Sequence, residues 1–176
     1  MFLNSFIRKI KKRFLSPEQY ARYIGVTVGE DCCFYDCQWS SEPYLITIGN
    51  HVQITSGVKF FTHGAGFLLR KEIPDFDTFG KIIIKDNVYI GNNVLIMPGV
   101  TIGNNVLIGA GSVVTKSVPD NSIVAGNPAK IIGNYNSYYE KYKLKNFHTK
   151  GDKNKKRKII NADAQLFIKK DFLSIK

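Results

Sequence analysis

The sequence contains no run of about 18 apolar residues, the length that a membrane-spanning helix requires. Its first 15 residues interleave apolar side chains with five Lys or Arg residues, so we expect no secretory signal peptide there. Cysteine is scarce, with only Cys32, Cys33 and Cys37 in the chain. No fourth ligand lies at a matching spacing, which argues against a metal site and favours reduced cysteines in a cytoplasmic protein.

Acidic residues are also few, and the excess positive charge lies at the two ends. The net charge is +11, with +5 on residues 1–23, −2 on residues 24–132 and +8 on residues 133–176. No groove-reading motif or aromatic platform accompanies this charge, so we expect no nucleic-acid partner. Phe2–Leu15 has apolar residues at helical spacing with cations between them. That pattern fits either a helix that caps the rest of the fold or weak contact with an anionic membrane surface.

What the sequence has in abundance is a six-residue repeat. Between Ile84 and Val114 an aliphatic residue occupies every sixth position, and a second apolar series runs four residues behind it. Neither a helix, with its period of 3.6, nor a strand, with its period of 2, produces a strict six. Gly and Asn often follow the leading aliphatic residue, and both tolerate the backbone of a sharp turn. The pattern predicts short strands and turns that stack into a solenoid, with three hexads in each triangular coil.

The same register extends upstream of this segment. The spacing from Ile48 to Ile84 is a whole number of hexads, and the register slips by two residues near Pro43. We therefore expect the solenoid to cover residues 24–132 in about six coils. Residues 64–81 interrupt the repeat as a long excursion, and long loops on rigid scaffolds often carry function.

Three parts are expected along the chain. Residues 1–23 are predicted to be a basic amphipathic helix, with a helix start at Ser16 and Pro17. Residues 24–132 form the all-β repeat domain. Residues 133–176 lack the repeat and are predicted to be a basic extension with short helices.

Several motifs within the repeats resemble a known family. They are Thr62-His63, Val88–Asn92, Pro98–Gly103, Gly109–Lys116 and Gly126–Lys130. In these motifs the chain resembles the hexapeptide-repeat acyltransferases, in the branch that acetylates sugars, antibiotics and polysaccharides. The resemblance implies a left-handed parallel β-helix, acetyl-CoA as co-substrate, and a homotrimer with active sites between protomers. The left-handed sense comes from the family alone, because general packing rules predict right-handed crossovers.

The resemblance implies that His63 is the general base. A sugar hydroxyl must lose its proton as it attacks a thioester, and the pKa of histidine suits that task. His51 is expected at an exposed turn and His148 in the basic tail. Several relatives place an acid directly after the base, where this chain has Gly64, and Glu42 is a candidate substitute.

The resemblance also places acetyl-CoA along the later coils. The matching cofactor-binding positions are Gly91, Asn92, Ala110, Thr115, Lys116 and Lys130. Small residues would let the pantetheine arm lie flat, and a backbone N–H near Asn92 could bind the oxyanion. Lys116 and Lys130 could pair with the CoA phosphates, or they could be ordinary solvated lysines.

Recognition of a carbohydrate acceptor falls to the excursion, whose side chains could equally pack the loop against a neighbouring prism. The candidate residues are Phe67, Arg70, Asp75, Phe76, Asp77 and Phe79. The leading prediction is direct O-acetylation of a cell-surface polysaccharide or its precursor, in the cytoplasm or at the inner membrane surface, where the two basic termini could make weak contact with the membrane. N-acetylation of an amino sugar and inactivation of an antibiotic are neighbouring alternatives. A β-helix carbonic anhydrase would need three histidines converging on zinc, and a non-catalytic scaffold would need none of these motifs.

Overall fold

The structure is a computed structural model that describes residues 10–151, 156–162 and 164–170 of the chain. The chain divides into two compact units, Met1–Tyr135 and Asn136–Lys176. Within the described ranges, no helix has the length and hydropathy needed to cross a membrane.

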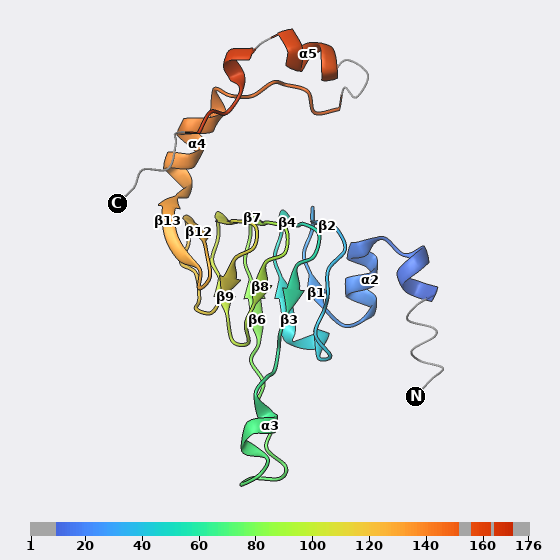
Figure 1. Cartoon of the computed structure of the whole chain (residues 1–176). Helices are drawn as coiled ribbons and strands as arrows, with labels where there is room; N and C mark the ends of the chain where they lie inside the picture. The colour runs from blue at the N-terminus through green and yellow to red at the C-terminus, as the bar shows by residue number, and fades with distance from the viewer. Residues whose placement is uncertain (1–9, 152–155, 163, 171–176) are drawn as a thin grey trace. The chain divides into compact units, whose positions relative to one another are not determined.

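Three sheets form the first unit, and the chain visits them in turn (Figure 1). Sheet A contains β1 (Thr27–Val28), β3 (Ile46–Ile48), β6 (Ile82–Ile84) and β9 (Thr101–Ile102). Sheet B contains β2 (Cys33–Phe34), β4 (Val52–Ile54), β7 (Val88–Ile90), β10 (Val106–Ile108), β12 (Ser122–Ala125) and β13 (Lys130–Asn134). Sheet C contains β5 (Lys59–Phe60), β8 (Leu95–Ile96) and β11 (Val113–Val114). Strands of successive coils pair in parallel, and β13 turns back antiparallel to β12. The result is a parallel β-helix, as the repeat predicts.

The number of coils differs from the expected six. Ile48 pairs directly with Ile84, which in turn pairs with Ile102. The stretch from Ile48 to Ile84 is therefore one coil plus the excursion. The described residues form four coils and a partial fifth that contains β12. Counting positions could not reveal this, because an insertion whose length is a multiple of six preserves the register.

The leading aliphatic residues fill the inside of the coils. Ile84, Ile90, Ile96, Ile102 and Ile108 are at most 1% exposed, which confirms the prediction. The second series is buried with them at Val88, Val94, Val100 and Val106. Full burial of one such side chain is worth about 1.5–3 kcal/mol, so the hydrophobic effect fixes both the coil and its register.

A ladder of side-chain hydrogen bonds supports the corner between sheets A and B. His51 Nδ1 lies 2.9 Å from Asn87 Oδ1, Asn87 donates to Asn105 Oδ1 at 2.7 Å, and Asn105 donates to Asn121 Oδ1 at 2.9 Å. All four residues have positive φ, between 53° and 58°. Asparagine suits the corner because it tolerates this backbone and its amide both donates and accepts.

Helix α2 (Pro17–Tyr23) closes the open end of the first coil. The Glu18 carboxylate accepts a hydrogen bond from the Phe34 N–H, and Arg22 donates to the Val28 carbonyl. These contacts satisfy backbone groups that have no earlier coil to pair with. Residues 10–14 are also helical, and the rest of the predicted amphipathic segment, residues 1–9, lies outside the described residues.

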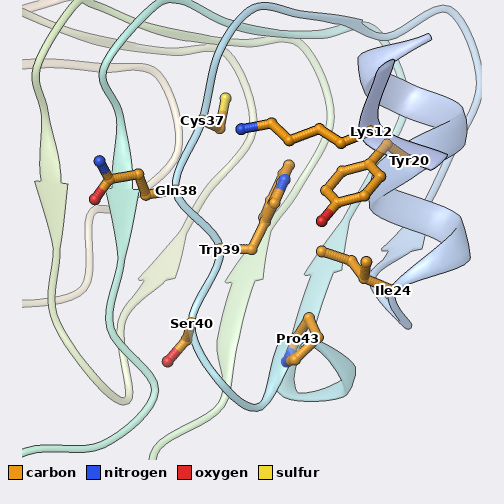
Figure 2. Close-up of a pocket in the computed structure, with 8 residues that line it drawn as sticks. All are labelled: Lys12, Tyr20, Ile24, Cys37, Gln38, Trp39, Ser40 and Pro43. Atoms are coloured by element: carbon orange, nitrogen blue, oxygen red, sulfur yellow. The ribbon is translucent and has the colours of Figure 1, made fainter. Parts of the chain in front are cut away.

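Trp39 lies at this capped end. Its ring stacks on Phe60, with centroids 4.8 Å apart and planes within 6°. Figure 2 shows Tyr20 and Ile24 facing it from the helix side of a pocket of about 370 Å³. Cys37 is buried beside this pocket, and burial raises the pKa of its thiol to about 12. The three cysteines are free thiols.

The remaining elements lie outside the regular coils. The 3₁₀-helix η1 (Pro43–Leu45) occupies the predicted register slip, and α3 (Gly66–Leu69) lies in the excursion. Helix α4 (Tyr135–Lys143) begins at the last residue of the first unit and continues in the second unit, which also contains α5 (Lys156–Ala162) and η2 (Ala164–Leu166). Strand β13 crosses the boundary predicted at residue 132 and ends at Asn134.

Candidate active site

His63 lies where the chain leaves the prism to form the excursion, the segment that carries α3 in Figure 1. An antiparallel bridge joins His63 to Phe79, and the Gly80 N–H donates to the Thr62 carbonyl at 2.7 Å. The Phe79 ring meets the imidazole edge-on, with centroids 6.1 Å apart. The two ends of the excursion are thus joined at its base, which holds the imidazole in a defined position.

A carboxylate from the preceding coil binds this histidine. Glu42 Oε2 lies 2.7 Å from His63 Nδ1 and accepts a second hydrogen bond from Thr62 Oγ1 at 2.7 Å. Ser40 Oγ lies 2.6 Å from Thr62 Oγ1 and accepts from the Thr62 N–H at 3.2 Å. Since a carboxylate only accepts, the Thr62 hydroxyl points to Glu42 and the Ser40 hydroxyl donates to Thr62. These hydrogen bonds from Ser40 to Thr62 and from Thr62 to Glu42 hold the Glu42 carboxylate in place.

The network sets the proton positions at the site. The hydrogen bond from Thr62, and then that from His63, hold the pKa of Glu42 below its usual value despite its partial burial. An ionised Glu42 requires a proton on His63 Nδ1, so in the neutral imidazole Nε2 carries the free lone pair. The His63 side chain is 42% exposed, against 18% for Glu42. The arrangement therefore offers an oriented, accessible base backed by a shielded negative charge.

An open depression of about 420 Å³ borders His63. Its walls are Phe61, His63, Gly64, Ala65, Thr78, Met97 and Pro98. A Cβ placed on Gly64 would meet nothing within 4 Å, so the space beside this residue is open. The floor is largely apolar, which suits a flat, weakly polar chain better than a charged group.

The depression and the predicted CoA-binding residues lie along the same sheet, sheet C. The Phe61 N–H bonds to the Ile96 carbonyl and the Met97 N–H to the Val114 carbonyl, so Phe61, Met97 and Thr115 stack in successive coils. Lys116 follows directly in the sequence. Gly91, Asn92 and Ala110 occupy the other corner of sheet C, between β7 and β8 or between β10 and β11. Ala129 bonds to Val113 in the last coil, just before Lys130. All the predicted positions thus border one face of the prism.

Gly91 has a structural reason of its own, and the Asn92 backbone joins two coils. A Cβ on Gly91 would lie 2.6 Å from the Ala110 backbone nitrogen, so the close approach of the next coil requires glycine there. The Asn92 carbonyl accepts the Gly111 N–H at 2.8 Å. Ala110, Thr115, Lys116 and Lys130 have exposed side chains and remain accessible to a ligand.

The predicted acceptor residues fall into two groups, those that bond within the excursion and those that are exposed. Arg70 Nε donates to the Phe76 carbonyl at 3.0 Å, and its guanidinium lies 3.9 Å from Asp77, so these contacts hold the shape of the excursion. Phe67 is 89% exposed, and Phe79 is half exposed beside His63. Only Phe79 among the predicted acceptor residues touches the base.

The three histidines have different surroundings. His51 belongs to the corner ladder, His63 bonds to Glu42, and His148 lies in the second unit. Within the described ranges, no group of three His, Cys, Asp or Glu side chains is arranged to hold a metal ion. This geometry offers no support for a zinc carbonic anhydrase.

Sequence reasoning missed part of this site. Ser40, Phe61 and Met97 gave no recognisable signal, because they are joined to His63 only by coil stacking. Glu42 could be noted from the sequence as an acid near a proline, but its distance to His63 needed the register slip near Pro43 to be placed in space.

The fold and the site together define a class of protein: a parallel β-helix with an oriented histidine beside one of its faces. Residues 81–116 match the model for "Bacterial transferase hexapeptide (six repeats)". Protein CapG from Staphylococcus aureus is 54% identical over 137 residues, which are 76% of this chain and 79% of CapG. The chain belongs to the hexapeptide-repeat acetyltransferase family.

Two further relatives describe the family's chemistry. The putative lipopolysaccharide biosynthesis O-acetyl transferase WbbJ from Escherichia coli K12 is 39% identical over 100 residues, which are 52% of this chain and 51% of WbbJ, so the match spans about half of that relative. A structure of galactoside acetyltransferase in complex with coenzyme A has 29% identity and a TM-score of 0.57, covering 78% of this chain and 82% of that one. The parallel sheets and this neighbour fit a left-handed parallel β-helix. The chain is an acetyltransferase with acetyl-CoA as co-substrate.

Proposed function

We propose that this acetyltransferase transfers the acetyl group to a sugar hydroxyl of a cell-surface polysaccharide or its precursor, with His63 as general base. The observation that carries the proposal is the short contact of 2.7 Å between His63 Nδ1 and Glu42 Oε2 beside the open depression. A histidine whose Nδ1 proton is donated to a carboxylate keeps Nε2 free to accept a proton.

The proposed reaction needs one proton transfer by the protein. Acetyl-CoA supplies the acetyl thioester, and a sugar hydroxyl bound in the depression attacks its carbonyl carbon. His63 Nε2 takes the hydroxyl proton as the new C–O bond forms, and Glu42 stabilises the imidazolium that results. The same proton can then pass to the departing thiolate, so the histidine returns to its starting state. No cysteine takes part.

In this proposal acetyl-CoA lies along the face of sheet C. Gly91, Asn92 and Ala110 at one corner and Thr115 at the other would border the pantetheine arm. Lys116 and Lys130, whose side chains are exposed, would pair with the phosphates. The face lacks large side chains at these positions, which favours an extended arm lying along the coils.

Assembly into a homotrimer would complete this site. A single prism leaves the excursion uncovered, with Phe67 89% and Leu68 76% exposed. Monomeric proteins rarely leave neighbouring large apolar side chains so open. We propose that a second copy of the chain covers them and completes the acceptor site. Sedimentation of the wild type as a trimer, and of Phe67→Ser/Leu68→Ser as a smaller species, would support this; a monomeric wild type would contradict it.

The acceptor is the part to identify by experiment. Purified protein with labelled acetyl-CoA should transfer label to a saccharide hydroxyl among nucleotide sugars, lipid-linked sugars and polysaccharide fragments, and His63→Ala should not. WbbJ, by its name, acts in lipopolysaccharide biosynthesis, which favours polysaccharide fragments. An alkali-stable product formed only with amino sugars would identify N-acetylation instead and overturn the O-acetyl assignment. The cytoplasmic location stays a prediction.

A further inference from the structure

The second unit concentrates positive charge on exposed side chains. Residues 136–176 carry twelve Lys or Arg residues and four acidic residues. Neither α4 nor α5 contains a buried residue. Glu140, the acid within α4, is paired with Lys143. Among the described residues of this unit, the Lys and Arg side chains are therefore displayed toward solvent and their charge is little neutralised.

Two segments of this unit are held together by a small number of contacts. Lys145 Nζ donates to the Gln165 carbonyl at 2.9 Å, and the rings of Phe147 and Phe167 lie 5.3 Å apart. The residues next to the end of α4 and those around η2 are thus brought side by side. Each segment contributes one partly covered aromatic ring to this junction.

Apolar side chains protrude beside the junction. Leu144 is 76% exposed, Ile168 is 58% exposed and Phe167 is 44% exposed. Lysines flank each of them in the sequence: Lys143 and Lys145 around Leu144, and Lys169 and Lys170 after Ile168. Exposed aliphatic groups cost free energy in water. Because these groups lie among cations, a partner that is both apolar and anionic would complement them.

We propose that the C-terminal unit binds the surface of a lipid bilayer that contains anionic lipids. Aliphatic side chains at the surface enter the boundary between headgroups and acyl chains, while the lysines stay among the phosphates. A nucleic acid or an acidic polysaccharide would satisfy the lysines but would leave Leu144 and Ile168 in water. This inference goes beyond the proposed function and does not depend on it.

Vesicle flotation with the full-length protein tests the proposal. The protein should float with vesicles of phosphatidylcholine and phosphatidylglycerol and stay in solution with phosphatidylcholine alone. Raised salt should release it, because the attraction is screened over about 10 Å at ordinary ionic strength. Equal flotation with both kinds of vesicle, or with neither, overturns the proposal.

Two pairs of substitutions separate charge from burial. Lys169→Glu/Lys170→Glu should lower the vesicle partition coefficient by more than about tenfold, since each surface cation contributes about fivefold. Leu144→Ser/Ile168→Ser should lower it by a similar factor without changing net charge. The matched control is Lys81→Glu/Lys85→Glu on the prism, which makes the same charge change and should bind vesicles as the wild type does.

Two further results would overturn the proposal. One is an equal loss in the prism control, which would reveal a response to net charge alone. The other is retention of Leu144→Ser/Ile168→Ser at wild-type strength, with binding to soluble polyanions as tight as to vesicles. The variant His63→Ala should bind vesicles normally, so failure of acetyl transfer and failure of membrane binding can be told apart.

Discussion

His51 and His63 lie on the same coil, twelve residues apart, and each uses Nδ1 for a hydrogen bond to a neighbouring coil. His51 Nδ1 bonds to the neutral amide of Asn87, its Nε2 lies 3.9 Å from Asp31 Oδ2, and the residue occupies a tight corner with φ of 53°. His63 bonds to the carboxylate of Glu42 and borders an open depression. The partner of Nδ1 and the cavity that borders the ring, rather than the residue type or its exposure, distinguish a structural histidine from one suited to accept a proton.

The difference originates in the segment of chain that comes after each histidine. After His51 the repeat resumes at once with Val52, so the corner must match the corners above and below it. After His63 the chain leaves the prism and returns at Phe79, so the stacking rules no longer apply there. Because of the interruption, the corner at His63 does not have to match the corners of the adjacent coils, and this leaves space for a substrate.

Replacement of the two histidines should give the largest contrast. His63→Ala removes the base and should lower kcat by about 10²–10⁴-fold, the range for loss of general base catalysis. His51→Ala should keep wild-type kcat. Initial rates with labelled acetyl-CoA measure both, and calorimetry should show that both variants still bind CoA. Comparable loss in the two variants would contradict the distinction drawn between the corners.

Glu42→Gln should have the next largest effect. A hydrogen bond to a charged partner is worth about 1.5–3 kcal/mol, so a loss of about 2 kcal/mol lowers kcat about thirtyfold. KM for acetyl-CoA should stay unchanged, since Glu42 is proposed to act through His63. The comparison with Asn87→Ala, which removes the partner of His51, should show no change in kcat.

The charge of Glu42 also predicts that the stability of the folded protein depends on pH. Its pKa is lowered from the usual 4.5, chiefly by the hydrogen bond from Thr62. A lowered pKa in the folded state means that the stabilisation by Glu42 is complete above the unfolded pKa and disappears as pH falls through the folded value. The stability gap between wild type and Glu42→Gln should therefore be constant at neutral pH and close in acid, as urea unfolding at several pH values can measure.

Removal of either proposed phosphate contact should have a smaller effect on catalysis. Lys116→Ala and Lys130→Ala should each raise KM for acetyl-CoA about two- to fivefold, because exposed ion pairs contribute about 1 kcal/mol or less. kcat should change little. Lys81→Ala removes an exposed lysine from a different part of the prism and serves as the control. Equal KM in all three variants would mean that these lysines are only solvated surface residues.

The smallest effect is expected in the corner ladder. Asn105→Ala removes hydrogen bonds both to Asn87 and to Asn121 and should lower the free energy of unfolding by about 1–2 kcal/mol. Activity at low temperature should be retained. Thermal unfolding followed by circular dichroism, together with the initial rate, would sharpen the contrast between a corner that stabilises and a corner that reacts.

The repeat made most of the fold predictable. A strict period of six has few structural solutions, and the buried series from Ile84 to Ile108 is a direct consequence of it. The number of coils was not predictable, because the excursion preserves the register between Ile48 and Ile84. The handedness came from family resemblance, since local patterns in the sequence do not encode it.

The site was predictable only where it coincides with a motif. His63 stands at the visible end of the repeat, so its position could be inferred. Its contacts with Glu42 and the support from Ser40 depend on a register slip of two residues and on stacking between coils. Residues brought together by stacking alone, such as Phe61 and Met97, leave no pattern along the chain.

The central claim is that Glu42 acts through His63 as one unit, and a double-mutant cycle on the rate of acetyl transfer tests it most directly. The four proteins are the wild type, Glu42→Gln, His63→Ala and the double variant, compared in single-turnover experiments at saturating acetyl-CoA. The account predicts that Glu42→Gln lowers the rate about thirtyfold in the wild type and has no further effect once His63 is alanine. The same thirtyfold loss in both backgrounds would contradict it, because Glu42 would then act independently of the histidine it contacts.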